Sequence, residues 1–230
     1  MRIVVLGCGT GVGKTRVSVA ILRQLAARGL SALGLKPIES GIAREVGQLA
    51  PPTGSDAAAL SLAGSVRTQL SHPLYALLDP VSPHLAARTQ GLRINLDDVS
   101  AWVSQAEGMT PHVLPPSAHW TVVETAGGVF SPLGDGFSNF ELAQQLEPAI
   151  WVLVAADALG VLHDVSSTLK AMRASGREPD HLVLSGAREP DASTGGNASE
   201  LATLGIVTPS AVLARNDDSG VQALIDRLLA

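Results

Sequence analysis

The stretch VVLGCGTGVGKT, from Val4 to Thr15, organises the rest of the chain. Its apolar start predicts a buried strand, and the glycine-rich turn leads through Gly-Lys-Thr into a segment with helical spacing of apolar residues. Strand, glycine-rich turn and helix in this order favour phosphate binding, because glycine lets backbone N–H groups converge on an anion at a helix start. The usual spacing is G-x4-G-K-[ST]. Here Cys8 stands at the first glycine position and Gly7 lies one residue earlier.

This loop predicts a nucleotide-binding site. Lys14 would reach the outer phosphates, and the Thr15 hydroxyl would ligate Mg²⁺. The alternative is a tight turn into a helix without any ligand, but the strand before and the helix after favour a nucleotide bound with Mg²⁺. The residues expected to bind it are Gly9, Gly11, Val12, Gly13, Lys14 and Thr15.

Length and composition predict one α/β domain over residues 1–230, with 46% hydrophobic and only 3% aromatic residues. The formal net charge is −5 and no basic block is present, so nucleic acid is not an expected partner. No stretch is long and apolar enough for a signal peptide or a membrane span. The only cysteine, Cys8, excludes an intrachain disulfide and is interpreted as a small apolar filler. We therefore expect a cytoplasmic protein.

Strands and helices are predicted to alternate along the chain, which indicates a single doubly wound, mostly parallel sheet with helices on both faces. The expected strands after the first are Ser31–Leu35, Trp120–Glu124, Ala149–Ala155, His181–Leu184 and an edge at Val212–Leu213. The expected helices after the first are Ala57–Ala63, a short one with Leu85, Ala86 and Ala87, then Asn95–Ala106, Asn139–Leu146, Gly160–Ala174, Ser199–Leu204 and Val221–Leu229. Surface loops are expected at Ile42–Gly54, Met109–Ala118 and, as a mobile segment, Gly195–Asn197.

Three charged residues stand where such a sheet places ligand groups. Lys36 follows a strand, at the edge where open α/β sheets bind ligands, although it could equally be a solvated loop lysine. Glu124 ends a strand, and an acid at that place in a phosphate-loop protein supplies a carboxylate to Mg²⁺; the alternative is an exposed strand-end residue. Asp56 is most simply interpreted as a helix cap, and the alternative is that its carboxylate binds a metal ion. His84, in a proline-rich loop, is interpreted as structural.

Taken together, several separated motifs resemble those of the dethiobiotin synthetase family. The combination of K-P-x-x-S-G with an S-P-H segment makes the resemblance fairly specific, and it covers about the first seven tenths of the chain. The matching segments are Gly7–Thr15, Lys36–Gly41, Ser55–Ala57, Asp79–His84, Glu124–Leu133 and, more weakly, Leu159–His163.

The resemblance implies a P-loop NTPase-like fold and an ATP-dependent ring closure on 7,8-diaminopelargonic acid. In that family one amine takes up CO₂ as a carbamate, ATP phosphorylates the carbamate, and the second amine attacks the mixed anhydride. Carried over, Lys14, Lys36, Thr10 and Ser40 would be catalytic, and Thr15, Asp56 and Glu124 would surround Mg²⁺. The implied substrate contacts are Thr10, Lys36, Ser40, Gly127, Gly128, Gly160, Val161, Leu162 and His163.

The resemblance also implies a homodimer with the active site at the interface, where the partner chain receives the substrate carboxylate near Gly160–His163. This chain departs from the family at three places. Gly9 and Gly11 replace residues that are often acidic, and His163-Asp164 replaces an Asn-His pair. The third departure is Ser185–Arg188, where an asparagine often reads the adenine, so a looser choice of nucleotide is open.

Other classes of protein compete with this interpretation. A partitioning or carrier ATPase of the deviant phosphate-loop type would use nucleotide to switch dimerisation, but such loops carry a lysine where this chain has Gly9. A cobyrinic-acid amidating synthetase would need a glutaminase domain with a cysteine nucleophile, and the only cysteine here lies in the loop. A nucleotide-binding module without catalysis is the third alternative.

Overall fold

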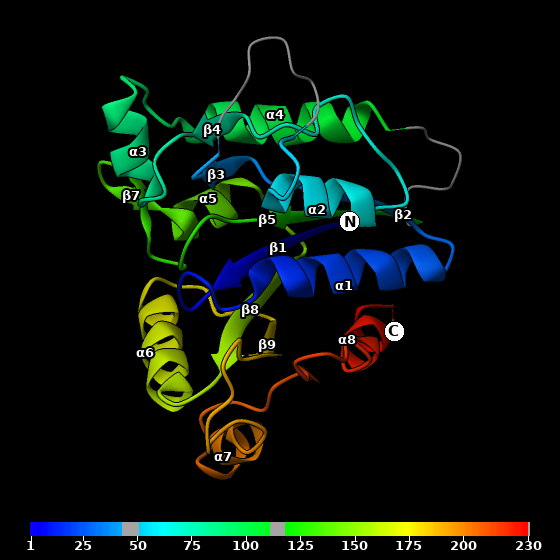
Figure 1. The fold of residues 1–230 in the computed structure, drawn as a ribbon, viewed down its shortest axis with the longest axis vertical. Helices are drawn as coiled ribbons and strands as arrows, with labels where there is room; N and C mark the ends of the chain where they lie inside the picture. The colour runs from blue at the N-terminus through cyan, green and yellow to red at the C-terminus, as the bar shows by residue number, and fades with distance from the viewer. Residues whose placement is uncertain (43–50, 111–117, 230) are drawn as a thin grey trace.

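The computed structural model describes residues 1–42, 51–110 and 118–229. One six-stranded sheet runs through them, and every neighbouring pair of its strands is parallel (Figure 1). From edge to edge its strands are β10 (Ala211–Leu213), β9 (His181–Gly186), β8 (Ile150–Asp157), β1 (Arg2–Gly7), β5 (His119–Glu124) and β2 (Ser31–Leu35). The predicted parallel α/β sheet is confirmed.

Helices cover both faces of this sheet, which explains why its strands are apolar almost throughout. In the central strand β1, Ile3 and Val5 belong to one core cluster, whereas Val4 and Leu6 belong to the other, as the two-residue period of a strand requires. The helices of the first cluster are α1 (Lys14–Ala27), α2 (Asp56–Ala63) and α8 (Val221–Leu229). Those of the second are α3 (Pro83–Thr89), α4 (Leu96–Gly108), α5 (Asn139–Gln145), α6 (Val161–Ala174) and α7 (Asn197–Thr203).

Two small sheets lie outside the main one and were not predicted. Strand β3 (Ile38–Ser40) pairs in parallel with β4 (Tyr75–Leu77), and β6 (Pro132–Gly134) pairs antiparallel with β7 (Phe137–Ser138). Strands of two or three residues are too short to show a hydrophobic period, so the sequence alone does not reveal them. The first pair matters for function because β3 follows Lys36 directly after Pro37.

The predicted elements of the main sheet are present, with shifted ends. Strands β8 and β9 each run two residues further than expected, to Asp157 and Gly186. The expected loops Ile42–Gly54 and Met109–Ala118 fall largely on residues 43–50 and 111–117, which lie outside the described residues. Of the helices in the described ranges, none has the length and apolar character needed to cross a bilayer.

The segment Gly195–Asn197, expected to be mobile, is instead held in place by a buried carboxylate. Asp157 at the end of β8 accepts a hydrogen bond from the Gly195 N–H at 2.9 Å and from Asn197 Nδ2 at 2.7 Å. Asn197 is the first residue of α7. The two glycines suggested mobility because nothing local in the sequence shows a partner 38 and 40 residues earlier.

We predict that Gly34→Ala destabilises the fold by about 1–3 kcal/mol. A Cβ at this position in β2 would lie 2.7 Å from the Leu60 carbonyl oxygen of α2 and 2.7 Å from Leu22 Cδ1 of α1. Gly108→Ala is the matched control, since a Cβ there meets no atom within 4 Å. Denaturant unfolding of both variants measures the difference, and equal stabilities would contradict the close approach of α1 and α2 over β2.

Candidate active site

The loop between β1 and α1 is shaped by glycines and braced by a neighbouring strand. Gly11 and Gly13 have φ angles of 75° and 94°, a region that L side chains rarely adopt. A Cβ on Gly13 would overlap the side chain of Ser185 at the end of β9, so the close contact between the loop and β9 leaves no room for a side chain at position 13. Lys14 folds back over the loop, and its Nζ donates to the Gly9 carbonyl oxygen at 3.1 Å.

Four residues from four separate segments meet beside this loop. Thr15 Oγ1, at the start of α1, lies 2.8 Å from Asp56 Oδ1 and 3.0 Å from Glu124 Oε1. Lys36 Nζ lies 2.5 Å from Glu124 Oε1 and 3.1 Å from Asp56 Oδ2. The Lys36 side chain is 4% exposed and that of Glu124 is completely buried. We call Thr15, Lys36, Asp56 and Glu124 the charge cluster.

The charge cluster stabilises its own charged forms. Burial alone would lower the pKa of Lys36, but the carboxylates of Glu124 and Asp56 outweigh burial and raise that pKa above its ordinary value. Burial would likewise raise the pKa of Asp56, but the Lys36 ammonium and the Thr15 hydroxyl hold it below the ordinary value. Lys14 is different, because burial and the nearby Lys36 lower its pKa to about 8. An anion placed between the two lysines would relieve their repulsion.

Two buried side chains that sequence reasoning missed support the charge cluster. Ser18, one turn into α1, donates to Glu124 Oε2 at 2.8 Å and lies 2.9 Å from the Lys14 carbonyl oxygen. Glu39 of β3 accepts hydrogen bonds from the backbone N–H groups of Asp56 and Ala57. Burial raises the pKa of Glu39, and those two bonds oppose the rise. The partner of Ser18 lies 106 residues away, so no local pattern marks it.

A cavity of about 650 Å³ opens over the loop and the charge cluster. Besides the four cluster residues, the predicted site residues that line it are Thr10, Gly11, Gly13, Lys14, Ser40 and Gly127. Ser40 Oγ is buried and has no hydrogen-bond partner among the described residues, so a ligand in the cavity could supply one. Glu39, Arg188 and the rim Pro80–Pro83 also line the cavity, and none of them was predicted as a site residue.

The remaining predicted residues lie near the cavity or away from it. The cavity lining does not include Gly9, Val12 or Gly128. Gly128 packs against the phosphate loop, because a Cβ on it would lie 3.3 Å from the Cys8 carbonyl oxygen. Gly160–His163, at the start of α6, are not part of this cavity in the single chain. Their expected role toward a partner chain stays a prediction.

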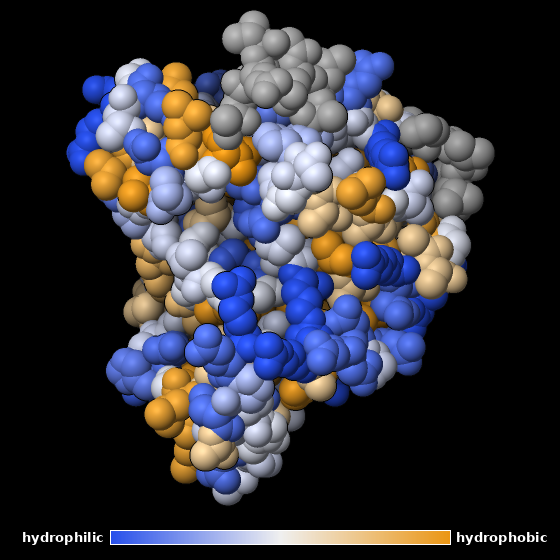
Figure 2. Space-filling view, in the orientation of Figure 1, coloured by the Kyte–Doolittle hydropathy of each residue, from blue (hydrophilic) through white to orange (hydrophobic). Residues whose placement is uncertain are grey.

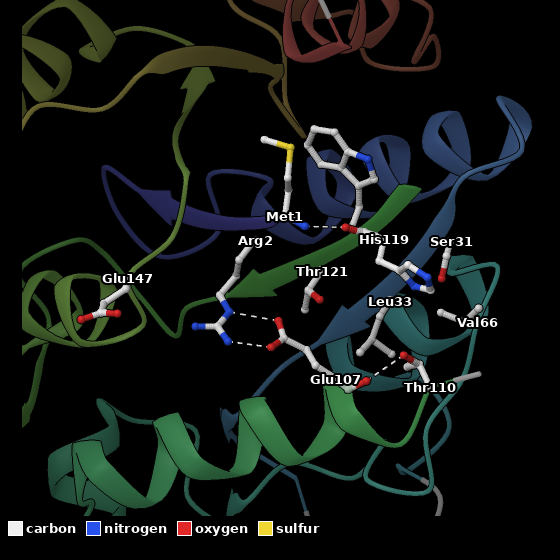
Figure 3. Close-up of a pocket in the computed structure, with 11 residues that line it drawn as sticks. Met1, Arg2, Ser31, Leu33, Val66, Glu107, Thr110, His119, Thr121 and Glu147 are labelled. Carbon is white, nitrogen blue, oxygen red and sulfur yellow. Dashed lines mark hydrogen bonds and ion pairs between the residues drawn. The ribbon is translucent and has the colours of Figure 1, made fainter. Parts of the chain in front are cut away.

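A second hollow, of about 410 Å³, lies at the opposite end of the sheet (Figure 3). Met1 and Arg2 at the start of β1 line it, together with His119 at the start of β5. The paired Arg2 and Glu107 side chains reach across it in Figure 3, with Arg2 Nε 3.0 Å from Glu107 Oε1. Parallel sheets bind ligands at the carboxyl ends of their strands, so this hollow is the less favourable candidate for an active site.

The fold and the loop define a P-loop NTPase-like protein. A family model described as an AAA domain matches residues 1–219. The ATP-dependent dethiobiotin synthetase BioD of Caulobacter sp. (strain K31) is 33% identical over 98% of this chain and 93% of its own length. That of Nitrosospira multiformis is 35% identical over 74% of this chain and 69% of its own. The chain belongs to the dethiobiotin synthetase family.

Solved structures show the same fold at much lower identity. The MinC:MinD cell division protein complex of Aquifex aeolicus matches with a TM-score of 0.52 at 10% identity, over 99% of this chain and 95% of that one. The ParA family ATPase of Chlorobium tepidum matches with a TM-score of 0.52 at 14% identity, over 98% and 89%. At these identities the likeness concerns the fold alone.

We predict that Cys8 reacts slowly with iodoacetamide at pH 8. Burial raises the pKa of its thiol to about 11, so the reactive thiolate is scarce and alkylation should be on the order of a hundredfold slower than at an ordinary thiol. The same chain unfolded in guanidinium is the control, because it contains a single cysteine. Equal rates in the native and unfolded chains would contradict the loop environment described above.

Proposed function

We propose that the protein uses ATP to close a ureido ring on 7,8-diaminopelargonic acid with CO₂, which forms dethiobiotin in biotin biosynthesis. Family membership supports the substrate. The observation that carries the chemistry is the buried Lys36 ammonium, fixed between Glu124 and Asp56 beside the phosphate loop. A cation held there faces the place where negative charge develops during phosphoryl transfer, so little reorganisation is needed when the reaction occurs.

The proposed reaction has two stages. A substrate amine first adds CO₂ to give a carbamate, and a carbamate oxygen then takes the γ-phosphoryl group of ATP, which releases ADP. The second amine attacks the carbonyl carbon of this mixed anhydride, so the ring C–N bond forms and inorganic phosphate leaves. Lys14 would contact the transferring phosphoryl group and Lys36 the carbamate, with Thr10 and Ser40 oriented toward the same centre. Most of the protein's contribution is then positioning and charge stabilisation.

The charge cluster fits a magnesium ion that is bound together with nucleotide. Thr15, Asp56 and Glu124 present one hydroxyl and two carboxylates, and oxygen is the ligand type that Mg²⁺ prefers. Within the described residues no group of three or more His, Cys, Asp and Glu side chains could hold a metal alone, so the proposal includes phosphate oxygens of the nucleotide among the ligands. When bound, the ion would neutralise phosphate charge.

A homodimer with the site at its interface is the proposed assembly. Val81, on the rim of the cavity, is 41% exposed, and Leu78 beside it is 57% exposed. Figure 2 shows apolar side chains gathered on the flank that carries α3. A second chain over this rim would bury them and could bring its Gly160–His163 segment to the substrate.

If the protein is a homodimer, light scattering should give twice the 23.6 kDa mass of the chain. A monomer at micromolar concentration would contradict the proposed assembly.

The direct test is product formation. The protein is incubated with diaminopelargonic acid, ¹⁸O-labelled bicarbonate, MgCl₂ and each nucleoside triphosphate in turn, and the products are followed by mass spectrometry. We expect the cyclic urea, with one labelled oxygen in the inorganic phosphate, and no product when EDTA removes the metal. Nucleotide hydrolysis without the cyclic urea would instead favour a switch-type ATPase, and unlabelled phosphate beside the urea would contradict the mixed anhydride.

Lys36→Ala should lower turnover by about a hundredfold or more while nucleotide affinity changes by only a few fold. The reason is that Lys36 lines the cavity, whereas the nucleotide would be held mainly by the loop and Lys14. The exposed Lys170 offers the matched control, Lys170→Ala. Thermal melting of each variant checks the fold, because Glu124 loses its buried partner. Normal turnover in folded Lys36→Ala would contradict the proposed role.

A further inference from the structure

The first turn of α2 is held by a carboxylate from another element. A helix start leaves its first backbone N–H groups without partners inside the helix. Glu39 Oε1 accepts from the Asp56 N–H at 2.7 Å and Glu39 Oε2 from the Ala57 N–H at 3.0 Å. Ser55, the N-cap residue, accepts from the next N–H, that of Ala58, at 3.1 Å. The helix start is therefore fully satisfied, and two of its bonds come from β3.

These bonds fix a residue of the charge cluster. The Asp56 side chain contacts Thr15 and Lys36, while its backbone is held by Glu39. Glu39 is 6% exposed, and its strand is held in register by β4, where Glu39 lies opposite Ala76. Lys36 and Glu39 are three residues apart on one short segment. This segment therefore holds Asp56 at two points, because Lys36 pairs with the Asp56 carboxylate and Glu39 accepts the Asp56 backbone N–H.

We infer that Glu39 is a positioning residue of the site, which acts through Asp56 and sets where the Asp56 carboxylate meets the metal–nucleotide complex. This inference rests on the proposed magnesium role of Asp56. A carboxylate suits the task because it accepts two N–H groups at once and its charge is favoured at a helix N-terminus. Groups that orient a metal ligand in this way commonly change metal affinity by 10–100-fold when they are removed.

A purely structural role for Glu39, as a second helix cap, makes a different prediction. Ser55 caps the same helix but binds Ala58 and not Asp56. Removing either cap should lower the melting temperature of the protein. Only removal of Glu39 should change the response to magnesium.

The experiment measures the Mg²⁺ concentration that half-saturates binding of a non-hydrolysable ATP analogue, by calorimetry on the full chain. Glu39→Ala is expected to raise that concentration by about 10–100-fold. Glu39→Gln, which keeps one acceptor oxygen, should give a smaller rise and serves if Glu39→Ala does not fold. Ser55→Ala should change it by less than about threefold. An equal rise in Ser55→Ala and Glu39→Ala would overturn the inference.

A double-mutant cycle tests whether Glu39 acts through Asp56. In an Asp56→Asn background, Glu39→Ala should change the half-saturating Mg²⁺ concentration by no more than about twofold, since residues that work as a unit are not additive. The full effect in both backgrounds would overturn the inference. If Asp56→Asn itself leaves the Mg²⁺ response unchanged, the magnesium role and this inference both fail. Formation of the cyclic urea by the unaltered protein decides the proposed reaction separately.

Discussion

The site depends on one buried ion pair, between the Lys36 ammonium and the Glu124 carboxylate. Burying a charge away from water is costly unless an opposite charge and hydrogen bonds compensate for it. Here the compensation comes from Asp56, Thr15 and Ser18, which belong to two further segments. The carboxyl ends of β2 and β5 and the starts of α1 and α2 must therefore all be in place before the pair is satisfied. Such a network is sensitive to geometry, which suits a site that acts by positioning.

Much of this arrangement can be predicted from the sequence because parallel strands bring their carboxyl ends to one edge. Lys36 and Glu124 each follow or end an apolar run, so the fold class places both at the edge of the sheet where the loop lies, and the observed strand order brings them together there. The longer helices can be predicted from their apolar period. The interpretation of Asp56 as a helix cap is off by one residue, because Ser55 is the N-cap of α2 and Asp56 is its first helical residue. The motifs that carry the family resemblance include these same residues.

The parts that could not be predicted depend on contacts between residues far apart in sequence. Glu39 lies inside the Lys36–Gly41 motif, but no local pattern shows that it accepts the backbone N–H groups at the start of α2, 17 and 18 residues later. Asp157 accepts hydrogen bonds from the segment that begins at Gly195 in a comparable way, and these bonds oppose the mobility that its glycines suggest. Short strands such as β3 arise from this packing and not from local preference. Local sequence patterns thus define the main sheet and its helices, whereas hydrogen bonds between distant residues decide how the loops and short strands are positioned.

A structure of the protein with Mg²⁺, a non-hydrolysable ATP analogue and diaminopelargonic acid would test the central claim most directly. We predict the triphosphate in the loop between Gly7 and Lys14, its last phosphorus facing both Lys14 and Lys36, and the substrate amines in the cavity beside Ser40. A loop without phosphate, or a nucleotide seated at the opposite end of the sheet near Arg2, would contradict it.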